Sequence, residues 1–120
     1  MDKPHKSLKA WQLAMDIVTD VYKITENFPS DERFGLVSQI RRSAVSVSSN
    51  IAEGAGRNTQ KEFVNFLHIS RGSLSELDTQ LEIASRLEFI DNETWKDLDS
   101  KLLEEDRILS GLINSLKGGK

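Results

Sequence analysis

The feature that most constrains the fold is the spacing of the apolar residues, which recur at alternating steps of three and four along almost the whole chain. This period is that of the α-helix, whereas a half-buried β-strand places apolar residues at every second position. Segments with proline, glycine, asparagine or aspartate break the pattern three times, and such residues are typical of turns. The sequence therefore predicts an all-α protein whose four helices cover residues 8–27, 31–54, 60–88 and 92–116.

The predicted helices are joined by short connections, which make consecutive helices antiparallel neighbours. The expected architecture is therefore an antiparallel up-down-up-down four-helix bundle. Residues 1–120 are expected to form a single domain, because most domains contain about 50 to 250 residues.

The first predicted helix has apolar residues on two faces instead of one. One stripe contains Leu8, Trp11, Met15, Val18 and Tyr22, and the other contains Leu13, Ile17, Val21, Ile24 and Phe28. At about 100° per residue the two stripes cover more than half of the helix surface. One neighbouring layer rarely covers so wide a surface, so we expect this helix to contact partners on two sides.

Each of the other helices has one apolar stripe, which is expected to face the core. The stripes contain Leu36, Ile40, Ala44, Val47 and Ile51; Phe63, Phe66, Leu67, Ser70, Leu74, Leu77, Leu81 and Ala84; and Trp95, Leu98, Leu102, Leu109, Leu112, Ile113 and Leu116. Glu105 lies on the last stripe and is expected either to pair with an arginine at the core edge or to face an open end. Gly72 costs its helix about 1 kcal/mol relative to alanine, which suggests close contact with another backbone. The serines of the second helix likewise suggest the close approach of a neighbouring helix.

The stretch EGAGRNTQKEF is predicted to be the turn between the second and third helices. Gly54 or Gly56 is expected to take the positive φ that ends a helix, and Thr59 followed by Glu62 has the spacing of a capping box. No predicted strand precedes the glycines, and their spacing fits neither a dinucleotide-binding motif nor a P-loop. A helix end is therefore favoured over a phosphate cradle. The residues expected to fix this turn are Asn50, Glu53, Gly54 and Gly56, together with Arg57.

The residues that usually carry catalysis or bind metals are absent or wrongly spaced. The chain has no cysteine, which excludes disulfides, cysteine nucleophiles and thiolate metal sites. Its two histidines, His5 and His68, have no second ligand at helical metal spacing, and the Glu-x-x-His motif of di-iron bundles does not occur,. No serine lies in a G-x-S-x-G motif. The sequence therefore predicts a protein that is not an enzyme, with no catalytic residue, no metal and no cofactor.

Positive charge is concentrated in the middle of the chain. Residues 36–73 contain 5 basic and 2 acidic residues, residues 74–120 contain 6 basic and 11 acidic residues, and the net charge is −3. The basic residues of the middle segment are Arg41, Arg42, Arg57, Lys61 and Arg71. If they cluster, they can bind the phosphates of RNA or DNA. The alternative is pairing with Glu53, Glu62 and the acidic last helix, within or between subunits, and the acidic net charge favours it, since nucleic-acid-binding domains are usually basic.

The start of the chain, MDKPHKSLKAWQ, is polar and charged and does not resemble a signal peptide,. No run approaches the roughly 20 consecutive apolar residues of a membrane-spanning helix. The sequence therefore predicts a cytoplasmic protein with no membrane as its partner.

Three stretches of the sequence carry a resemblance to a known family. They are FPSDERFGLVSQIRRSAVSVSSNIAEGAGR, KEFVNFLHISRGSLSELDTQL and LINSLK. In these stretches the chain resembles the four-helix bundle proteins of the 23S rRNA intervening-sequence family, and the match covers about Leu8 to Lys117. The family usually has proline before SNIAEG. This chain has Ser48 there, which weakens the expectation of a kink in the second helix.

The resemblance implies a bundle that assembles with itself into a ring-like homopentamer. It also implies a bacterial gene within an intervening sequence of 23S rRNA, or elsewhere as a free gene. Family members have no agreed biochemical activity, so we expect a non-enzymatic scaffold or adaptor of unknown process. The alternative is an RNA- or DNA-binding accessory protein similar to the accessory variability factor of diversity-generating retroelements, which has a similar fold but is strongly basic.

Overall fold

The computed structural model describes residues 3–118, which form four α-helices and two short 3₁₀ helices, with no strand among them. The α-helices are α1 (Lys9–Thr25), α2 (Leu36–Ala55), α3 (Gln60–Arg86) and α4 (Asn92–Gly118). The 3₁₀ helices are η1 (Pro4–Ser7) and η2 (Ser30–Glu32). The prediction of an all-α four-helix protein is confirmed.

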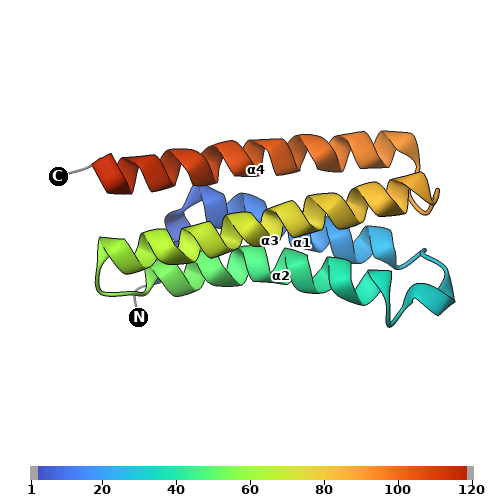
Figure 1. Ribbon diagram of the computed structural model, residues 1–120, viewed down its shortest axis with the longest axis horizontal. Coiled ribbons are helices and arrows are strands. Elements are labelled where there is room, and N and C mark those ends of the chain that lie inside the picture. The colour runs from blue at the N-terminus through green and yellow to red at the C-terminus, as the bar shows by residue number, and fades with distance from the viewer. Residues whose placement is uncertain (1–2, 119–120) are drawn as a thin grey trace.

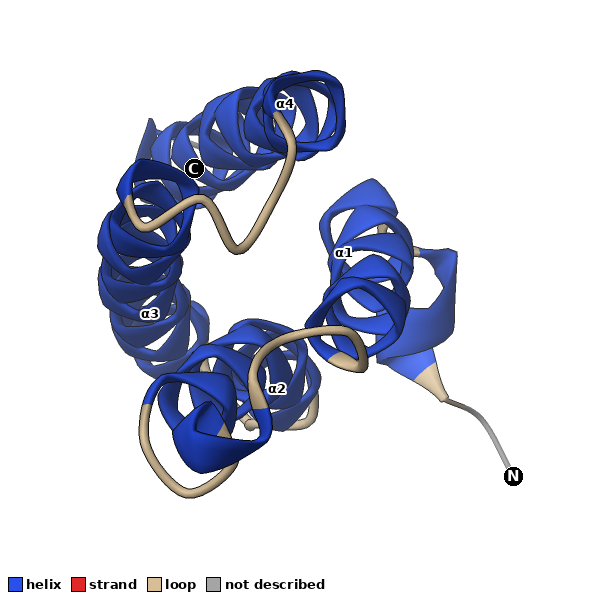
Figure 2. Cartoon of the chain, turned by 90° about the vertical axis from the view of Figure 1, so that its right-hand side faces the viewer, coloured by secondary structure: helices blue, strands red, loops and turns tan. Residues whose placement is uncertain are grey.

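The four α-helices pack in chain order around a common core, so that each contacts the next and α4 contacts α1 (Figure 1, Figure 2). Contacts between α2 and α3 show the direction of packing. The hydroxyl oxygens of Ser46 and Ser73 are 2.7 Å apart, and Gly54, nearer the end of α2, lies against Phe63, near the start of α3. Residues further along α2 therefore contact residues earlier in α3, so these two helices are antiparallel. The colours of Figure 1 show the same reversal at every turn, so the bundle runs up, down, up and down.

The core is built from the predicted inner stripes, which bury apolar side chains from all four helices. The large side chains with almost no exposed surface include Ile17, Val21, Ile40, Val47, Ile51, Leu67, Leu77, Leu81, Leu98 and Leu109. Removing such side chains from water is the main favourable term in folding. Of the two stripes on α1, the one that contains Ile17 and Val21 faces this core. No helix within residues 3–118 has the length and apolar character needed to cross a membrane.

Four helix boundaries differ from the predicted ones by two residues or more. Helix α1 ends at Thr25 instead of residue 27, and α4 ends at Gly118 instead of residue 116. Helix α2 begins at Leu36, later than predicted, because the residues after Pro29 form η2 and Gly35 has φ −107° and ψ −106°, outside the helical region,. Helix α3 ends at Arg86, before the predicted residue 88. Glu88 has a positive φ of 64°, and this left-handed conformation cannot continue a right-handed helix.

Small polar side chains let α2 and α3 approach closely. The hydroxyl groups of Ser46 and Ser73 share a hydrogen bond of 2.7 Å, and buried Ser70 donates one of 2.8 Å to the carbonyl of Val47. These bonds offset the cost of removing the hydroxyls from water. Gly72 takes no part, since it is exposed and a Cβ there would meet nothing within 4 Å. The prediction that Gly72 marks a close backbone contact is therefore wrong within the subunit, where serines make that contact.

Candidate functional site

The outer surface of α1 carries an apolar stripe that the subunit covers only in part. At its start, the ring of Trp11 packs against that of His5 in η1, with 5.0 Å between ring centroids. Further along the helix, Met15 is 38% exposed, Val18 is half-buried and Tyr22 is 42% exposed. Residues three or four positions apart share one face of a helix. The predicted α1 stripe that contains Met15 and Tyr22 is therefore a continuous, partly exposed apolar face.

Arg41 is engaged in the contact between α1 and α2. Its Nε donates a hydrogen bond of 2.9 Å to the hydroxyl of Thr25, and its Nη2 donates one of 3.2 Å to the carbonyl of Tyr22. Its guanidinium carbon lies 4.4 Å from the centre of the Tyr22 ring, within the range of a cation–π interaction. This predicted phosphate ligand therefore holds two helices of its own subunit together.

The other predicted basic residues lie on different parts of the bundle. Arg42 is exposed on the outside of α2 and Lys61 is exposed in the first turn of α3; neither forms an ion pair with any of residues 3–118. Arg57 follows the end of α2, and its guanidinium carbon lies 4.8 Å from the centre of an aromatic ring of α3. Arg71 pairs with Asp106 of α4 at 3.2 Å. The structure does not bring the five predicted basic residues into one patch.

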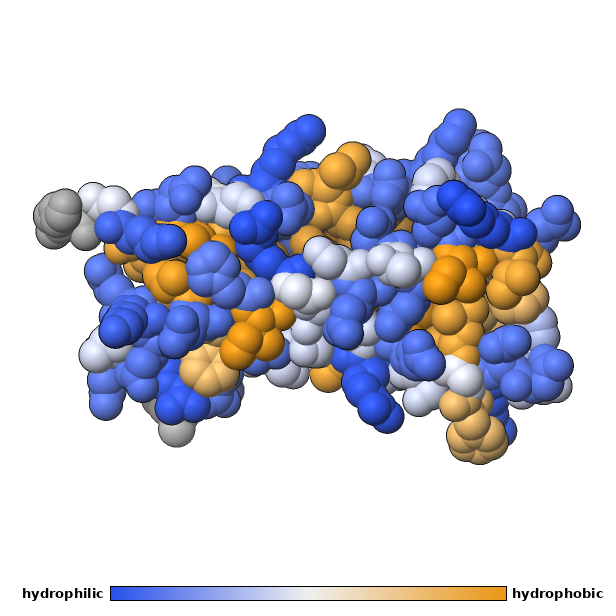
Figure 3. Space-filling view, in the orientation of Figure 1, coloured by the Kyte–Doolittle hydropathy of each residue, from blue (hydrophilic) through white to orange (hydrophobic). Residues whose placement is uncertain are grey.

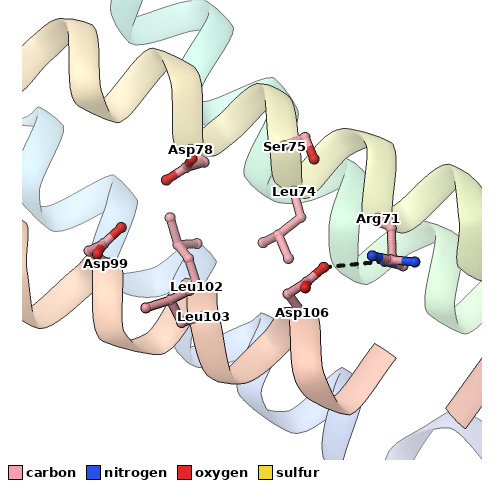
Figure 4. Close-up of a pocket in the computed structure, with 8 residues that line it drawn as sticks. All are labelled: Arg71, Leu74, Ser75, Asp78, Asp99, Leu102, Leu103 and Asp106. Atoms are coloured by element: carbon pink, nitrogen blue, oxygen red, sulfur yellow. Dashed lines mark hydrogen bonds and ion pairs between the residues drawn. The ribbon is translucent and has the colours of Figure 1, made fainter. Parts of the chain in front are cut away.

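A groove of about 370 Å³ runs between α3 and α4 (Figure 4). Leu74 and Leu102 are buried beneath it, whereas Leu103 is 55% exposed. The polar residues that line it are Arg71, Ser75, Asp78, Asp99 and Asp106. The groove thus combines apolar surface with three carboxylates and one guanidinium group.

Two carboxylates of this groove face each other without a cation between them. Asp78 of α3 and Asp99 of α4 point toward one another (Figure 4), and neither pairs with a lysine or arginine among residues 3–118. Partial burial raises the pKa of Asp78 above its ordinary value, and the charges of Asp99 and Glu82 raise it further. The negative charge here is therefore destabilised in the isolated subunit, and an approaching cationic group would stabilise it.

Glu105 lies in the core with no exposed surface, and within residues 3–118 neither of its carboxylate oxygens has a hydrogen-bond partner. Burial, and to a smaller extent the charge of Glu104, raises its pKa from 4.5 to about 8. Its polar neighbours on α4 form ion pairs with other residues, since Lys101 pairs with Asp20 of α1 and Asp106 pairs with an arginine of α3. The two predicted environments, an arginine partner and an open end, are both wrong.

A family model for the 23S rRNA-intervening sequence protein matches residues 6–111, most of the chain. The chain belongs to this family. No curated protein matches it. A similar solved structure is the crystal structure of a protein of unknown function from the S23 ribosomal protein family of Bacteroides thetaiotaomicron, with a TM-score of 0.81 and 22% sequence identity over 88% of this chain and 95% of that chain. At this identity the likeness shows a shared fold.

In this 23S rRNA-intervening sequence protein, helix α2 ends where predicted but in a different conformation. Neither Gly54 nor Gly56 has a positive φ. Gly56 caps α2 with φ −88°, and its N–H donates to the carbonyl of Ala52. Gly54 is buried inside the helix, where a Cβ would lie 2.8 Å from Cβ of Phe66 and 2.9 Å from Cδ1 of Phe63. The prediction of a positive φ is wrong; close packing against α3 is what requires a glycine at position 54.

Side chains around this turn also form local bonds. The hydroxyl of Thr59 accepts a hydrogen bond of 3.1 Å from the backbone N–H of Glu62, as the capping-box spacing indicates,. Arg57 donates to Glu53 at 2.6 Å across the end of α2. Asn50 donates to the carbonyl of Ser46 one turn earlier, inside α2. The bond between Arg57 and Glu53 therefore joins the start of the turn to the end of α2, whereas the bond of Asn50 lies wholly within α2.

The acidic groove of this family member was not predicted, although the sequence contains a signal for it. Antiparallel helices joined by a short turn place side by side the residues that are equally far from the turn. Asp78 and Asp99 are nearly equally far from the centre of the α3–α4 turn, as are Arg71 and Asp106. Pairing the two helices in this register would have placed both pairs together.

Proposed function

We propose that this chain is a non-enzymatic, self-assembling bundle that acts as a cytoplasmic scaffold or adaptor in the form of a homopentameric ring. The observation that carries the proposal is the partly exposed apolar face of α1, which includes Met15 and Tyr22. Leaving apolar surface in water costs about 25 cal/mol per Å², and continuous exposed apolar faces mark interaction sites. A ring of five subunits is what the resemblance to the family implies.

The position of Glu105 supports a non-enzymatic role. Burial raises the pKa of this side chain to about 8, a value suited to a general acid or base near neutral pH. A catalytic acid or base must come within hydrogen-bond reach of its substrate. Glu105 has no exposed surface, so its proton is held inside the subunit and away from any surface ligand.

The wild-type protein is expected to have the mass of five subunits in solution, and Met15→Glu is expected to weaken assembly at least tenfold. A carboxylate on the α1 face would have to be desolvated in the assembled interface, at a cost of about 1–3 kcal/mol. Native mass spectrometry and sedimentation velocity over a concentration series measure both effects. Ser100→Glu, an equivalent change at another exposed helix position, is the control and should leave the mass unchanged. A monomeric wild-type protein at micromolar concentration would refute self-assembly.

Nucleic-acid binding is the second candidate function, and one groove favours it. Lys61 at the start of α3 and Lys117 near the end of α4 both line a groove of about 430 Å³, together with the amide side chains of Gln60 and Asn65. Lysines and amides are common ligands of the phosphate backbone. This groove lies beside the α2–α3 turn, which carries the exposed Arg57.

If this candidate is correct, the protein binds single- or double-stranded RNA or DNA at low salt, and Lys61→Glu with Lys117→Glu lowers the affinity at least tenfold. The logarithm of the binding constant should fall linearly with the logarithm of the salt concentration, because each neutralised phosphate releases counterions. Fluorescence anisotropy with labelled oligonucleotides measures both, and Lys96→Glu on the same helix α4 is the control. Absence of binding at low salt would eliminate this candidate.

A further inference from the structure

We infer that the groove between α3 and α4 receives the outer face of α2 of a second copy of this chain, so that the subunits join head to tail. The occupant is the arginine ridge, which consists of Arg41, Arg42 and Val45. This inference rests on the proposed self-assembly and goes beyond it, because it assigns the two surfaces that meet. The ridge adjoins the partly exposed α1 face, since the guanidinium carbon of Arg41 lies 4.4 Å from the centre of the Tyr22 ring.

Two of the three residues of the arginine ridge, Arg42 and Val45, have charge and apolar surface that their own subunit leaves uncovered. Arg42 is exposed and forms no ion pair with residues 3–118. Val45 is 40% exposed and lies on the same face, since three positions separate it from Arg42 and four from Arg41. The same helix face also holds Ser38, Ser49 and Ala52, which lie seven positions before Val45 and four and seven positions after it. These small side chains leave room for another helix pair to approach the ridge closely.

The groove has the complementary character. Asp78 and Asp99 face each other across it without a cation, and Leu103 is 55% exposed. A guanidinium group between the two aspartates would form charge-assisted hydrogen bonds with both and relieve the repulsion that raises the pKa of Asp78,. The volume of about 370 Å³ leaves room for long side chains. Arg42 would meet the aspartates while Val45 covers Leu103.

The two surfaces lie on different sides of the bundle, so one subunit can use both at once. Figure 2 shows the outside of α2 on one side of the molecule and the α3–α4 edge on another. A contact between two different surfaces is heterologous, and repeating it generates a ring when the rotation closes. The space-filling view shows further apolar side chains interrupting the polar surface toward both ends of the bundle (Figure 3). The ridge and groove differ from these because their charges are opposite and complementary.

Charge reversal at each surface tests the inference. Arg42→Glu and Asp99→Arg are each expected to raise the dissociation constant for self-assembly at least tenfold, because each places like charges in the interface. The double variant Arg42→Glu with Asp99→Arg restores opposite charges on every pair of neighbours and is expected to assemble again. Wild-type assembly should also weaken as salt is added. Sedimentation velocity measures association, and circular dichroism checks that each variant folds.

Both single variants are expected to fold. Arg42 has no ion pair to lose in the described part of the subunit, and an arginine at position 99 would lie beside Asp78 and reduce repulsion there. Lys96→Glu, which makes the same charge change as Arg42→Glu outside both surfaces, is the control and should leave assembly intact.

The outcomes separate this inference from the proposed function. A monomeric wild-type protein overturns both. A wild-type oligomer that both single variants leave intact overturns only the ridge-and-groove contact, and the groove then belongs to another partner or to none. Single variants that dissociate without rescue in the double variant also overturn the contact, because the two residues then act on different interfaces. Dissociation of both single variants with rescue in the double variant supports it.

Discussion

Replacing Glu105 with leucine is expected to raise the free energy of unfolding by about 3 kcal/mol at pH 7. In the folded subunit burial raises the pKa of Glu105 to about 8, compared with an ordinary value of 4.5. At neutral pH the folded state therefore holds a proton at Glu105 that the unfolded state has released. Leucine removes the need for that proton and also removes two oxygens that have no hydrogen-bond partner among residues 3–118.

The same difference in pKa gives the wild-type protein a stability that falls as pH rises. Stability increases with pH only where the unfolded state binds more protons, and here the folded state binds more. Below about pH 4.5 both states hold the proton, and above about pH 8 both have lost it. Between these limits the free energy of unfolding should fall by about 1.4 kcal/mol per pH unit from this group. Glu105→Gln and Glu105→Leu should both lack this contribution.

Urea denaturation followed by circular dichroism at a series of pH values measures the effect. The protein concentration must be constant, because assembly of folded subunits adds to the apparent stability. The difference in the free energy of unfolding between wild type and Glu105→Leu gives the contribution of Glu105 alone. Other titrating groups, such as Asp78, whose pKa is also raised, contribute equally to both proteins. Glu76→Leu at an exposed position of α3 is the matched control and should change stability by no more than about 0.5 kcal/mol. A less stable leucine variant would show that the carboxyl group has a stabilising partner.

The helical spacing of apolar residues predicted the fold well because burial in a bundle repeats with the helical period. It correctly selected Ile40, Val47 and Leu77 as core residues. It also identified the outer stripe on α1, which contains Met15 and Tyr22, and Tyr22 is indeed 42% exposed. The same pattern placed Glu105 on the core-facing stripe of α4, but its complete burial and its lack of a hydrogen-bond partner among residues 3–118 were not predicted. Both depend on where the side chains of the three other helices lie.

The basic residues show the limit of sequence reasoning about the candidate site. Their number and sign are evident from the sequence, but their partners depend on the packing of helices. Arg41 bonds to Thr25 of α1, whereas Arg71 pairs with Asp106 of α4. Only the three-dimensional arrangement shows that Arg42 is left without an ion pair in the described part of the chain. Arg41 and Arg71 therefore connect helices within the subunit, whereas Arg42 is a candidate docking residue.

Gly54→Ala is expected to lower the free energy of unfolding by about 1–3 kcal/mol, although alanine favours helix over glycine by about 1 kcal/mol. The new Cβ would lie 2.8 Å from Cβ of Phe66 and 3.2 Å from the carbonyl oxygen of Phe63. Both atoms belong to or adjoin the backbone of α3, so neither can move aside without displacing that helix. The overpacking therefore outweighs the gain in helix propensity.

Gly72→Ala and Gly111→Ala are the matched controls, because both glycines are exposed within helices and a Cβ on either would meet nothing within 4 Å. Each is expected to stabilise the subunit by about 1 kcal/mol through helix propensity alone. Guanidinium denaturation of the three variants at one protein concentration compares them directly. If Gly54→Ala were as stabilising as the controls, α3 would have to retreat from α2 at little cost, and close packing would no longer explain the glycine at position 54. A destabilised Gly54→Ala beside stabilised controls would instead show that the contact between α2 and α3 fixes this residue.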